Sequence, residues 1–199
     1  EKDASNNLSL KIFSYNFFLK SDQIIKNEIN EFSEISIYCS IGYSNMNKSR
    51  ETACETLKRF LPNIQIKSFI SNEAYIGANV IIEDGCLILP KSIIEPNVTI
   101  KKGSVLWFGS QVCHHSTISS YSWLAAASVV GAKCLVGERT FIAVGGIVPS
   151  GTNLAKGTLI TAGSVSPQTT NENQVVDRKD FSNENKFPNF NSDDLIRFL

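Results

Sequence analysis

The chain has 199 residues, enough for one sizeable hydrophobic core or for one core and a small second domain. Nineteen basic and nineteen acidic side chains leave no net charge, which argues against binding to nucleic acid or to an anionic membrane surface. The five cysteines form no Cys-x-x-Cys pair, no secretion signal opens the chain, and no apolar run reaches the roughly 20 residues that span a bilayer, so a reducing, cytoplasmic location is predicted.

Residues 1–70 predict a small α/β domain. Asn45 or Asn47 is expected to cap the second of its helices, and Pro62 to stop it. The usual strand followed by Gly-x-Gly-x-x-Gly is not found, so the front portion of this domain is expected to be missing or to be replaced by LSLKIFSYNFF. Helices and strands alternate in the expected order: a helix over 20–32, a strand over 34–43, a helix over 47–60 and a strand over 64–70.

A six-residue period dominates the next part of the chain. Ile, Leu or Val occupies every sixth position from Ile76 to Ile160, and a second column from Val80 to Ser164 contains only small or β-branched residues. A six-residue unit with one large and one small inward side chain is a short strand and a turn, and three units close one triangular coil of a parallel β-helix. The sequence therefore predicts a mainly β protein whose β-helix domain covers residues 71–166.

The period is lost after Ser166. Residues 167–199 are polar and are expected to form a C-terminal cap or tail. A short helix beginning at Ser192, with Asp193 and Asp194 in its first turn, could cover the open end of the last coil, and a disordered tail is the alternative.

Three stretches resemble the bacterial sugar O- and N-acyltransferases of the hexapeptide-repeat superfamily. They are SIGYSNMNKSRE, the hexad region containing HHSTI, and GGIVPSGTNLAKGTLITAGSVS, and the resemblance covers about residues 35–166. The group includes sialic acid O-acetyltransferases and N-acetyltransferases of nucleotide-linked 4-amino sugars. The resemblance implies a left-handed β-helix, a homotrimer, acetyl-CoA as co-substrate in the grooves between subunits, and an N-terminal domain of Rossmann type that holds the sugar nucleotide.

His114 and His115 are the only histidines of the chain. They lie between Val112, an inward aliphatic residue, and Ser116, an inward small residue, so both are expected near a turn and facing outward. An outward histidine can accept a proton at neutral pH, as a general base must. The resemblance places His114 at the position of the catalytic base and His115 where some relatives carry an acidic residue.

Further contacts follow from the same register and resemblance. The backbone N–H of Ala132 is expected to stabilise the oxyanion, and Trp123 stands where some relatives have a second histidine near the acetyl group. A helix beginning where a strand ends can bind a phosphate, although an ordinary capped helix with a solvated lysine is the alternative. The expected coenzyme A phosphate contacts are Lys133, Arg139 and Lys156, and the expected sugar-nucleotide contacts are Gly42, Tyr43, Asn45 and Lys48.

Several functions remain open at this point. N-acetylation of a nucleotide-linked amino sugar comes first, O-acetylation of sialic acid or a related sugar second, and a non-catalytic β-helix that assembles a complex third. A zinc enzyme on the same scaffold would need three histidine ligands, whereas this chain has two adjacent histidines, so no metal is expected.

Overall fold

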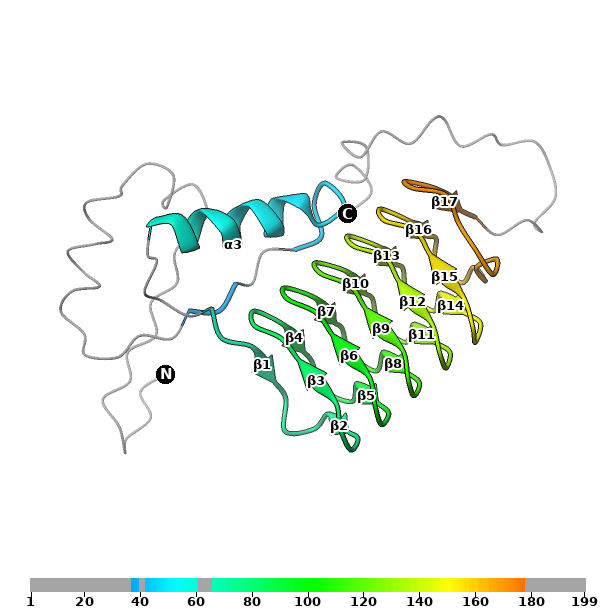
Figure 1. Cartoon of the computed structure of the whole chain (residues 1–199), viewed down its shortest axis with the longest axis horizontal. Helices are drawn as coiled ribbons and strands as arrows, with labels where there is room; N and C mark the ends of the chain where they lie inside the picture. The colour runs from blue at the N-terminus through cyan, green and yellow to red at the C-terminus, as the bar shows by residue number, and fades with distance from the viewer. Residues whose placement is uncertain (1–36, 40–41, 61–65, 178–199) are drawn as a thin grey trace.

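The computed structural model describes residues 37–39, 42–60 and 66–177. These residues form a mainly β structure, a parallel β-solenoid of about six turns that matches a left-handed β-helix. Helix α3, Lys48–Phe60, lies alongside the solenoid (Figure 1). The helices expected over 20–32 and from Ser192 lie outside the described residues.

The solenoid is built from two-residue strands that stack in parallel. The first sheet has the order β1-β4-β7-β10-β13-β16-β17, the second β14-β11-β8-β5-β2, and the third β15-β12-β9-β6-β3, so three successive strands complete one coil. Their bounds are β1 Phe69–Ile70, β2 Tyr75–Ile76, β3 Ile81–Ile82, β4 Leu87–Ile88, β5 Ile93–Ile94, β6 Thr99–Ile100, β7 Val105–Leu106, β8 Gln111–Val112, β9 Thr117–Ile118, β10 Trp123–Leu124, β11 Val129–Val130, β12 Leu135–Val136, β13 Phe141–Ile142, β14 Ile147–Val148, β15 Asn153–Leu154, β16 Leu159–Ile160 and β17 Val175–Val176.

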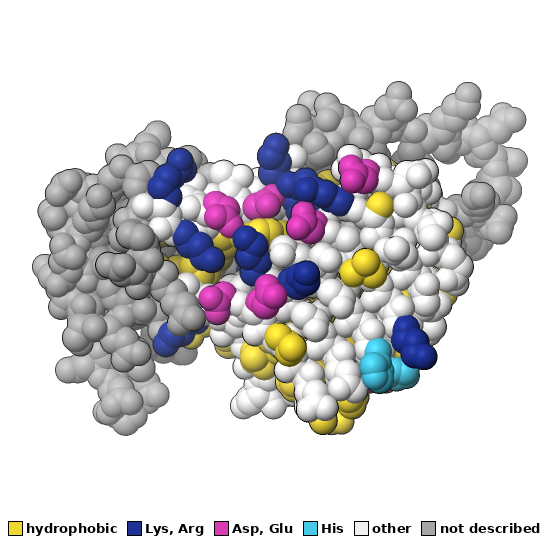
Figure 2. Space-filling model, viewed as in Figure 1, with side chains coloured by type: hydrophobic (Ala, Val, Ile, Leu, Met, Phe, Trp, Pro, Cys, Tyr) yellow, Lys and Arg dark blue, Asp and Glu magenta, His cyan; other side chains and the backbone are white. Residues whose placement is uncertain are grey.

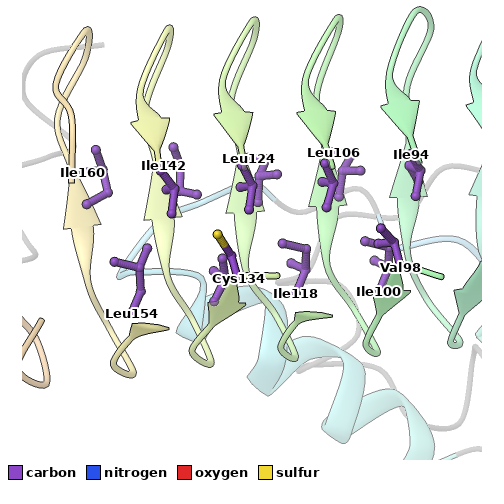
Figure 3. Close-up of a cluster of buried hydrophobic side chains, with 14 of the residues drawn as sticks. Ile94, Val98, Ile100, Leu106, Ile118, Leu124, Cys134, Ile142, Leu154 and Ile160 are labelled. Atoms are coloured by element: carbon purple, nitrogen blue, oxygen red, sulfur yellow. The ribbon is translucent and has the colours of Figure 1, made fainter. Parts of the chain in front are cut away.

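The large aliphatic column predicted from the six-residue period forms the core. From Ile88 to Ile160 every member is buried, and side chains from successive coils stack on one another inside the solenoid (Figure 3). At the first coil Ile76 is still 37% exposed, because no coil precedes it among the described residues. The periodic prediction of an inward column is confirmed.

The column of small residues is also buried from Cys86 onward, as predicted, and several of its hydroxyl groups find acceptors, whereas Thr152 Oγ1 has none among the described residues. Ser104, Ser116 and Ser122 each donate from Oγ to a backbone carbonyl about one coil further along, at 3.0, 2.8 and 2.9 Å. A buried hydroxyl without an acceptor would cost free energy, so these bonds explain why serine is tolerated inside an apolar core.

The solenoid continues past the point where the period ends. Val175 and Val176 of β17 pair with Leu159 and Ile160 of β16, after a connection that does not keep the six-residue spacing. β17 therefore extends the first sheet by pairing with the edge strand β16, although the six-residue period does not predict a strand there.

Residues 37–39 and 42–60 contact the solenoid near the first strand of the solenoid, β1. Ile37 forms a parallel bridge with Ile66, and Lys67 N donates to Ile37 O at 2.9 Å before β1 joins β4 in the first sheet. Within the strand expected over 64–70, the described residues therefore form two pairings: Ile66 pairs with Ile37, and β1 pairs with β4. Ala53 and Leu57 of α3 are buried in this region.

Arg50 attaches α3 to the solenoid. Its side chain is fully buried, and Nε and Nη2 donate to the carbonyl oxygens of Gly103 at 2.8 Å and Gly85 at 2.7 Å, while Nη1 donates to Cys39 O. A guanidinium group distributes its donors in a plane, so one side chain connects two solenoid turns with the segment that precedes the helix.

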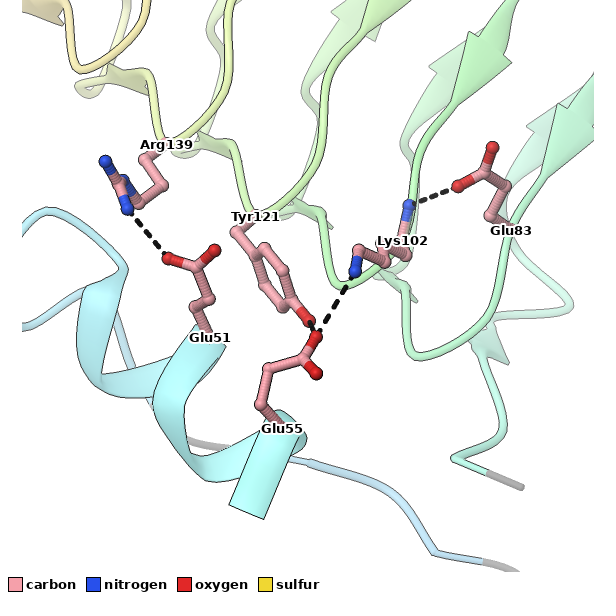
Figure 4. Close-up of polar contacts among 6 residues, drawn as sticks. All are labelled: Glu51, Glu55, Glu83, Lys102, Tyr121 and Arg139. Atoms are coloured by element: carbon pink, nitrogen blue, oxygen red, sulfur yellow. Dashed lines mark hydrogen bonds and ion pairs between the residues drawn. The ribbon is translucent and has the colours of Figure 1, made fainter. Parts of the chain in front are cut away.

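A second set of polar contacts joins α3 to the solenoid turns (Figure 4). Arg139 Nη1 lies 2.9 Å from Glu51 Oε2, and Glu55 Oε1 accepts hydrogen bonds from Tyr121 Oη at 3.0 Å and Lys102 Nζ at 3.2 Å. The Tyr121 ring lies against Gly103, where an added Cβ would come within 2.3 Å of it, so only glycine fits there.

The predicted side-chain cap of α3 is wrong for Asn47. Its amide is buried and neither polar atom has a hydrogen-bond partner, whereas its carbonyl accepts from Glu51 N at 3.0 Å. Asn45, Met46 and Asn47 all have positive φ, so a left-handed backbone turn, closed by the Lys48 N to Asn45 O bond at 2.9 Å, begins the helix.

Candidate active site

The histidine pair lies in the turn between β8 and β9, where the second and third sheets meet. The turns of successive coils stack along this edge, which we call the histidine edge and which comprises residues 77–80, 95–98, 113–116, 131–134 and 149–152. Backbone bonds connect the turns, with His115 N donating to Pro96 O at 3.2 Å and Lys133 N to His114 O at 3.0 Å.

Both histidine side chains are exposed, as predicted from the register. Figure 2 shows them at one edge of the molecule, apart from the acidic and basic side chains that gather over α3 and the adjoining turns. Their position leaves the rings open to an incoming ligand.

The two rings contact each other directly. Nδ1 of His114 lies 3.0 Å from Nδ1 of His115, with the ring planes at 89°. One of these nitrogens must therefore carry the shared proton. Nε2 of His114 has no hydrogen-bond partner among the described residues, so it is the ring nitrogen available to a substrate.

Two residues of the preceding coil support the pair, and sequence reasoning missed both. Glu95 Oε2 accepts the backbone N–H of His114 at 2.8 Å, and Asn97 Nδ2 lies 3.4 Å from His115 Nε2. Both occupy the turn stacked directly before the histidine turn. Reading three hexads backward from Cys113 and His115 would have identified them.

Cys113 is poorly suited to nucleophilic catalysis. Burial, followed by the neighbouring Glu95 carboxylate, raises the pKa of its thiol. A raised pKa keeps the thiol protonated at neutral pH, whereas the thiolate is the reactive form. The chemistry available at this edge is therefore proton transfer by imidazole rather than formation of an acyl-cysteine.

Ala132 and Lys133 lie on the coil after the histidines, at the same edge. The backbone N–H of Ala132 donates to Ser150 Oγ at 3.0 Å, so an oxyanion would have to replace this hydroxyl as its acceptor. Gly131 permits the close stacking, because an added Cβ would lie 2.5 Å from Ser150 N. Of the predicted coenzyme A contacts, these two are the ones that the structure brings to the histidines.

Trp123 lies elsewhere. It is 4% exposed on the outer face of the first sheet, where its ring stacks on Trp107 at 5.3 Å and meets Tyr43 edge-on at 5.4 Å. Within one chain Trp123 belongs to the apolar cluster against which Tyr43 and Met46 pack, and it does not approach the histidine edge.

Arg139 and Lys156 lie at the edge between the third and first sheets. Arg139 pairs with Glu51, and Lys156 Nζ lies 3.1 Å from Glu138 Oε2. The single chain therefore places both away from His114.

The predicted sugar-nucleotide contacts cluster at the start of α3. Gly42, Asn45 and Lys48 are exposed, whereas Tyr43 is half-buried, with its ring 4.8 Å from that of Phe141. Tyr43 thus has a packing role, and the three exposed residues remain accessible in this left-handed turn.

Two features are not found in the part of the chain that the structure describes. No cluster of three or more His, Cys, Asp or Glu side chains there could hold a metal ion. None of the helical structure in residues 37–39, 42–60 and 66–177 is long and apolar enough to cross a bilayer.

Solved structures that share this architecture include acetyltransferases. PerB from Caulobacter crescentus, in complex with CoA and GDP-perosamine, is 20% identical over 77% of this chain and 72% of its own, with a TM-score of 0.70. The acetyltransferase domain of PglB from Neisseria gonorrhoeae is 17% identical over 75% and 72%, with a TM-score of 0.67. WeeI from Acinetobacter baumannii is 16% identical over 74% and 72%, with a TM-score of 0.51.

At such identities the likeness shows a shared fold. No protein with a curated description matches the chain. Residues 63–180, more than half of the chain, match the family described as GMPPB C-terminal domain. The chain therefore belongs to the GMPPB C-terminal domain family.

Proposed function

We propose that this protein is an acetyl-CoA-dependent acetyltransferase that N-acetylates a nucleotide-linked amino sugar, with His114 as the general base. One observation carries the proposal: an exposed histidine whose Nδ1 is held by a second histidine and whose Nε2 is unengaged among the described residues. Neighbours of the same fold bind CoA and GDP-perosamine, which supports these two ligand classes.

The reaction needs one proton acceptor. As the amine nitrogen attacks the thioester carbonyl, His114 Nε2 takes a proton from it, and the resulting imidazolium can return that proton to the departing thiolate. The amide bond forms and the carbon–sulfur bond breaks, with no covalent enzyme intermediate. The Ala132 N–H, released by Ser150, would stabilise the oxyanion.

The outer face of the second sheet supports assembly into the expected homotrimer. Its row of exposed apolar side chains is interrupted at β8 by Gln111, and β8 leads directly into the histidine turn. Exposed apolar surface of this kind marks an interaction site. A neighbouring copy packed there would wall the groove in which acetyl-CoA lies. The row consists of Tyr75, Ile93, Ile147 and Val165.

The test is a thiol-release assay with acetyl-CoA and a panel of nucleotide-linked 4-amino sugars, free sialic acid and a no-acceptor control. We expect turnover with an amino sugar, and a loss of about 10²–10⁴-fold in kcat for His114→Ala with an unchanged unfolding midpoint. His115→Ala should lower kcat less.

The possible results separate the alternatives. Turnover with sialic acid alone would replace the proposal by O-acetylation. A folded protein that releases no thiol with any acceptor would favour a non-catalytic assembly role. Near wild-type activity of His114→Ala would remove His114 from the mechanism.

A further inference from the structure

We propose that Asn97 is a positioning residue that determines which ring nitrogen of His114 carries the proton. The inference deepens the proposed function and rests on it for its catalytic consequence. Its structural content is a relay of side chains along the histidine edge that ends at the base.

The relay crosses three coils. Asn79 Nδ2 lies 3.2 Å from Asn97 Oδ1, Asn97 Nδ2 lies 3.4 Å from His115 Nε2, and the two histidine Nδ1 atoms are 3.0 Å apart. Asn79, Asn97 and His115 occupy the same left-handed position of three successive turns, with φ of 57°, 60° and 59°. Stacking of equivalent turns therefore aligns their side chains, and asparagine is well suited to this backbone conformation.

The direction of the hydrogen bonds fixes the tautomer of His114. If the Asn97 amide donates to His115 Nε2, His115 must carry its proton on Nδ1 and donate it to His114 Nδ1. His114 then has its proton on Nε2 and cannot act as a base there. When the hydrogen bonds run in this direction, His114 Nε2 is protonated and cannot accept a proton from a substrate.

Rotation of the Asn97 amide by half a turn, together with the amide of Asn79, which donates to Asn97 Oδ1 in the structure, exchanges oxygen and nitrogen and reverses every step. His115 Nε2–H then donates to Asn97 Oδ1, His115 Nδ1 accepts from His114 Nδ1–H, and His114 Nε2 has a free lone pair. The same arrangement persists when His114 becomes doubly protonated, because His114 Nδ1–H is already a donor. The base therefore requires Asn97 to act as an acceptor.

Glu95 does not substitute for Asn97 in this role. Its carboxylate accepts the backbone N–H of His114 at 2.8 Å, which holds the turn rather than a ring nitrogen. In this chain a neutral pair, His115 and Asn97, thus orients the base, and both amide directions are available to it.

The test reads the tautomer without any substrate. Because the chain has only two histidines, a sample labelled with ¹⁵N on the histidine rings reports this pair alone by NMR, and His115→Gln assigns the two sets of signals. Spectra are recorded on the full chain at a pH where both rings are neutral. We expect the Nδ1–H form of His114 to dominate in the wild type, which requires the Asn97 and Asn79 amides to be rotated from their orientation in the structure, where Asn97 Nδ2 faces His115 Nε2.

Two substitutions at one position separate the acceptor from the donor. Asn97→Asp offers an acceptor only, so His114 should be driven fully into the Nδ1–H form. Asn97→Gly keeps the left-handed turn and removes both groups, so the Nε2–H form should increase and kcat should fall about tenfold, within the 10²–10⁴-fold that a general base supplies. Lys91→Gly, at φ of 61° with an exposed side chain, is the matched control and should change neither property.

The outcomes distinguish this proposal from the proposed function. If the tautomer ratio of His114 is the same in the wild type and both Asn97 variants, the relay is refuted even when the enzyme is active. If the ratio shifts as expected but no acceptor is acetylated, the relay stands and the acetyltransferase proposal fails. Unfolding midpoints of the variants close to that of Lys91→Gly confirm that the comparison is made on folded protein.

Discussion

The first and second sheets share one backbone geometry and one buried core, yet their outer faces differ. From β7 to β16 the outward side chains of the first sheet are buried in a cluster with Tyr43 and Met46, whereas most apolar outward side chains of the second sheet are exposed. The buried set is Val105, Trp123, Phe141 and Leu159, at 0%, 4%, 8% and 6% exposure, and the exposed set is Tyr75, Ile93, Ile147 and Val165, at 59%, 37%, 42% and 57%.

This difference shows that strand composition alone does not decide which face of a solenoid is covered. Both faces are apolar, because β-branched and aromatic residues suit a two-residue strand on either side. The first sheet is covered by a segment of the same chain, which Arg50 anchors. The second sheet has no equivalent cover among the described residues, which favours a second copy of the chain as its partner.

The largest predicted effect tests the covered face directly. Phe141→Ala should lower the free energy of unfolding by about 3–5 kcal/mol, because it leaves a cavity under Tyr43. Leu135→Ala, on the exposed outer face of the third sheet, is the control and should cost less than about 1 kcal/mol. Denaturant titration measures both, and equal losses would contradict the contrast between the faces.

The second prediction detaches the cover. Arg50→Met should destabilise the protein by about 2–4 kcal/mol, because buried carbonyls lose their donors. Trp107 and Trp123 should then become more exposed, giving a red shift of tryptophan fluorescence. Arg139→Met removes only a partly exposed ion pair and should cost less than about 1 kcal/mol. A similar loss of stability for both variants would show that Arg50 contributes no more to stability than the Arg139–Glu51 ion pair.

The third prediction tests the exposed outer face of the second sheet. Ile147→Glu should change the stability of the isolated chain by less than about 1 kcal/mol but reduce the mass in solution from that of a trimer, because it places a charge in an apolar contact. Light scattering measures the mass, with Leu135→Glu as the equally exposed control. A trimer that survives Ile147→Glu would move the interface to another face.

The smallest predicted effect concerns the rim of the covered face. Burial acts to raise the pKa of Glu55, but hydrogen bonds from Lys102 and Tyr121 outweigh it and lower the pKa. A lowered folded-state pKa contributes stability that is present above the ordinary value of about 4.3 and is lost as pH falls through the folded value.

Glu55→Gln should therefore cost less than about 1 kcal/mol at neutral pH, and the difference from wild type should shrink on acidification. Parallel denaturant titrations at neutral and acidic pH measure it. A difference that is independent of pH would mean that the Glu55 charge contributes nothing to docking α3.

The sequence by itself determined the solenoid, its inward columns and the outward direction of His114 and His115. A strict period of six leaves one way to bury every sixth aliphatic residue, so a local pattern repeated along the chain specifies the whole architecture. The same register locates the histidine turn, because the inward residues Val112 and Ser116 flank it.

Other side-chain contacts were decided by the tertiary structure alone. The period could have placed Glu95 and Asn97 next to the histidines, but it gives no sign that Trp123 is buried under Tyr43 or that Arg139 pairs with Glu51 rather than facing a ligand. These contacts join residues that are distant in sequence, and they depend on how α3 docks and how turns align. A periodic pattern gives the direction of each side chain, whereas the partner it meets there is decided by the packing of the folded chain.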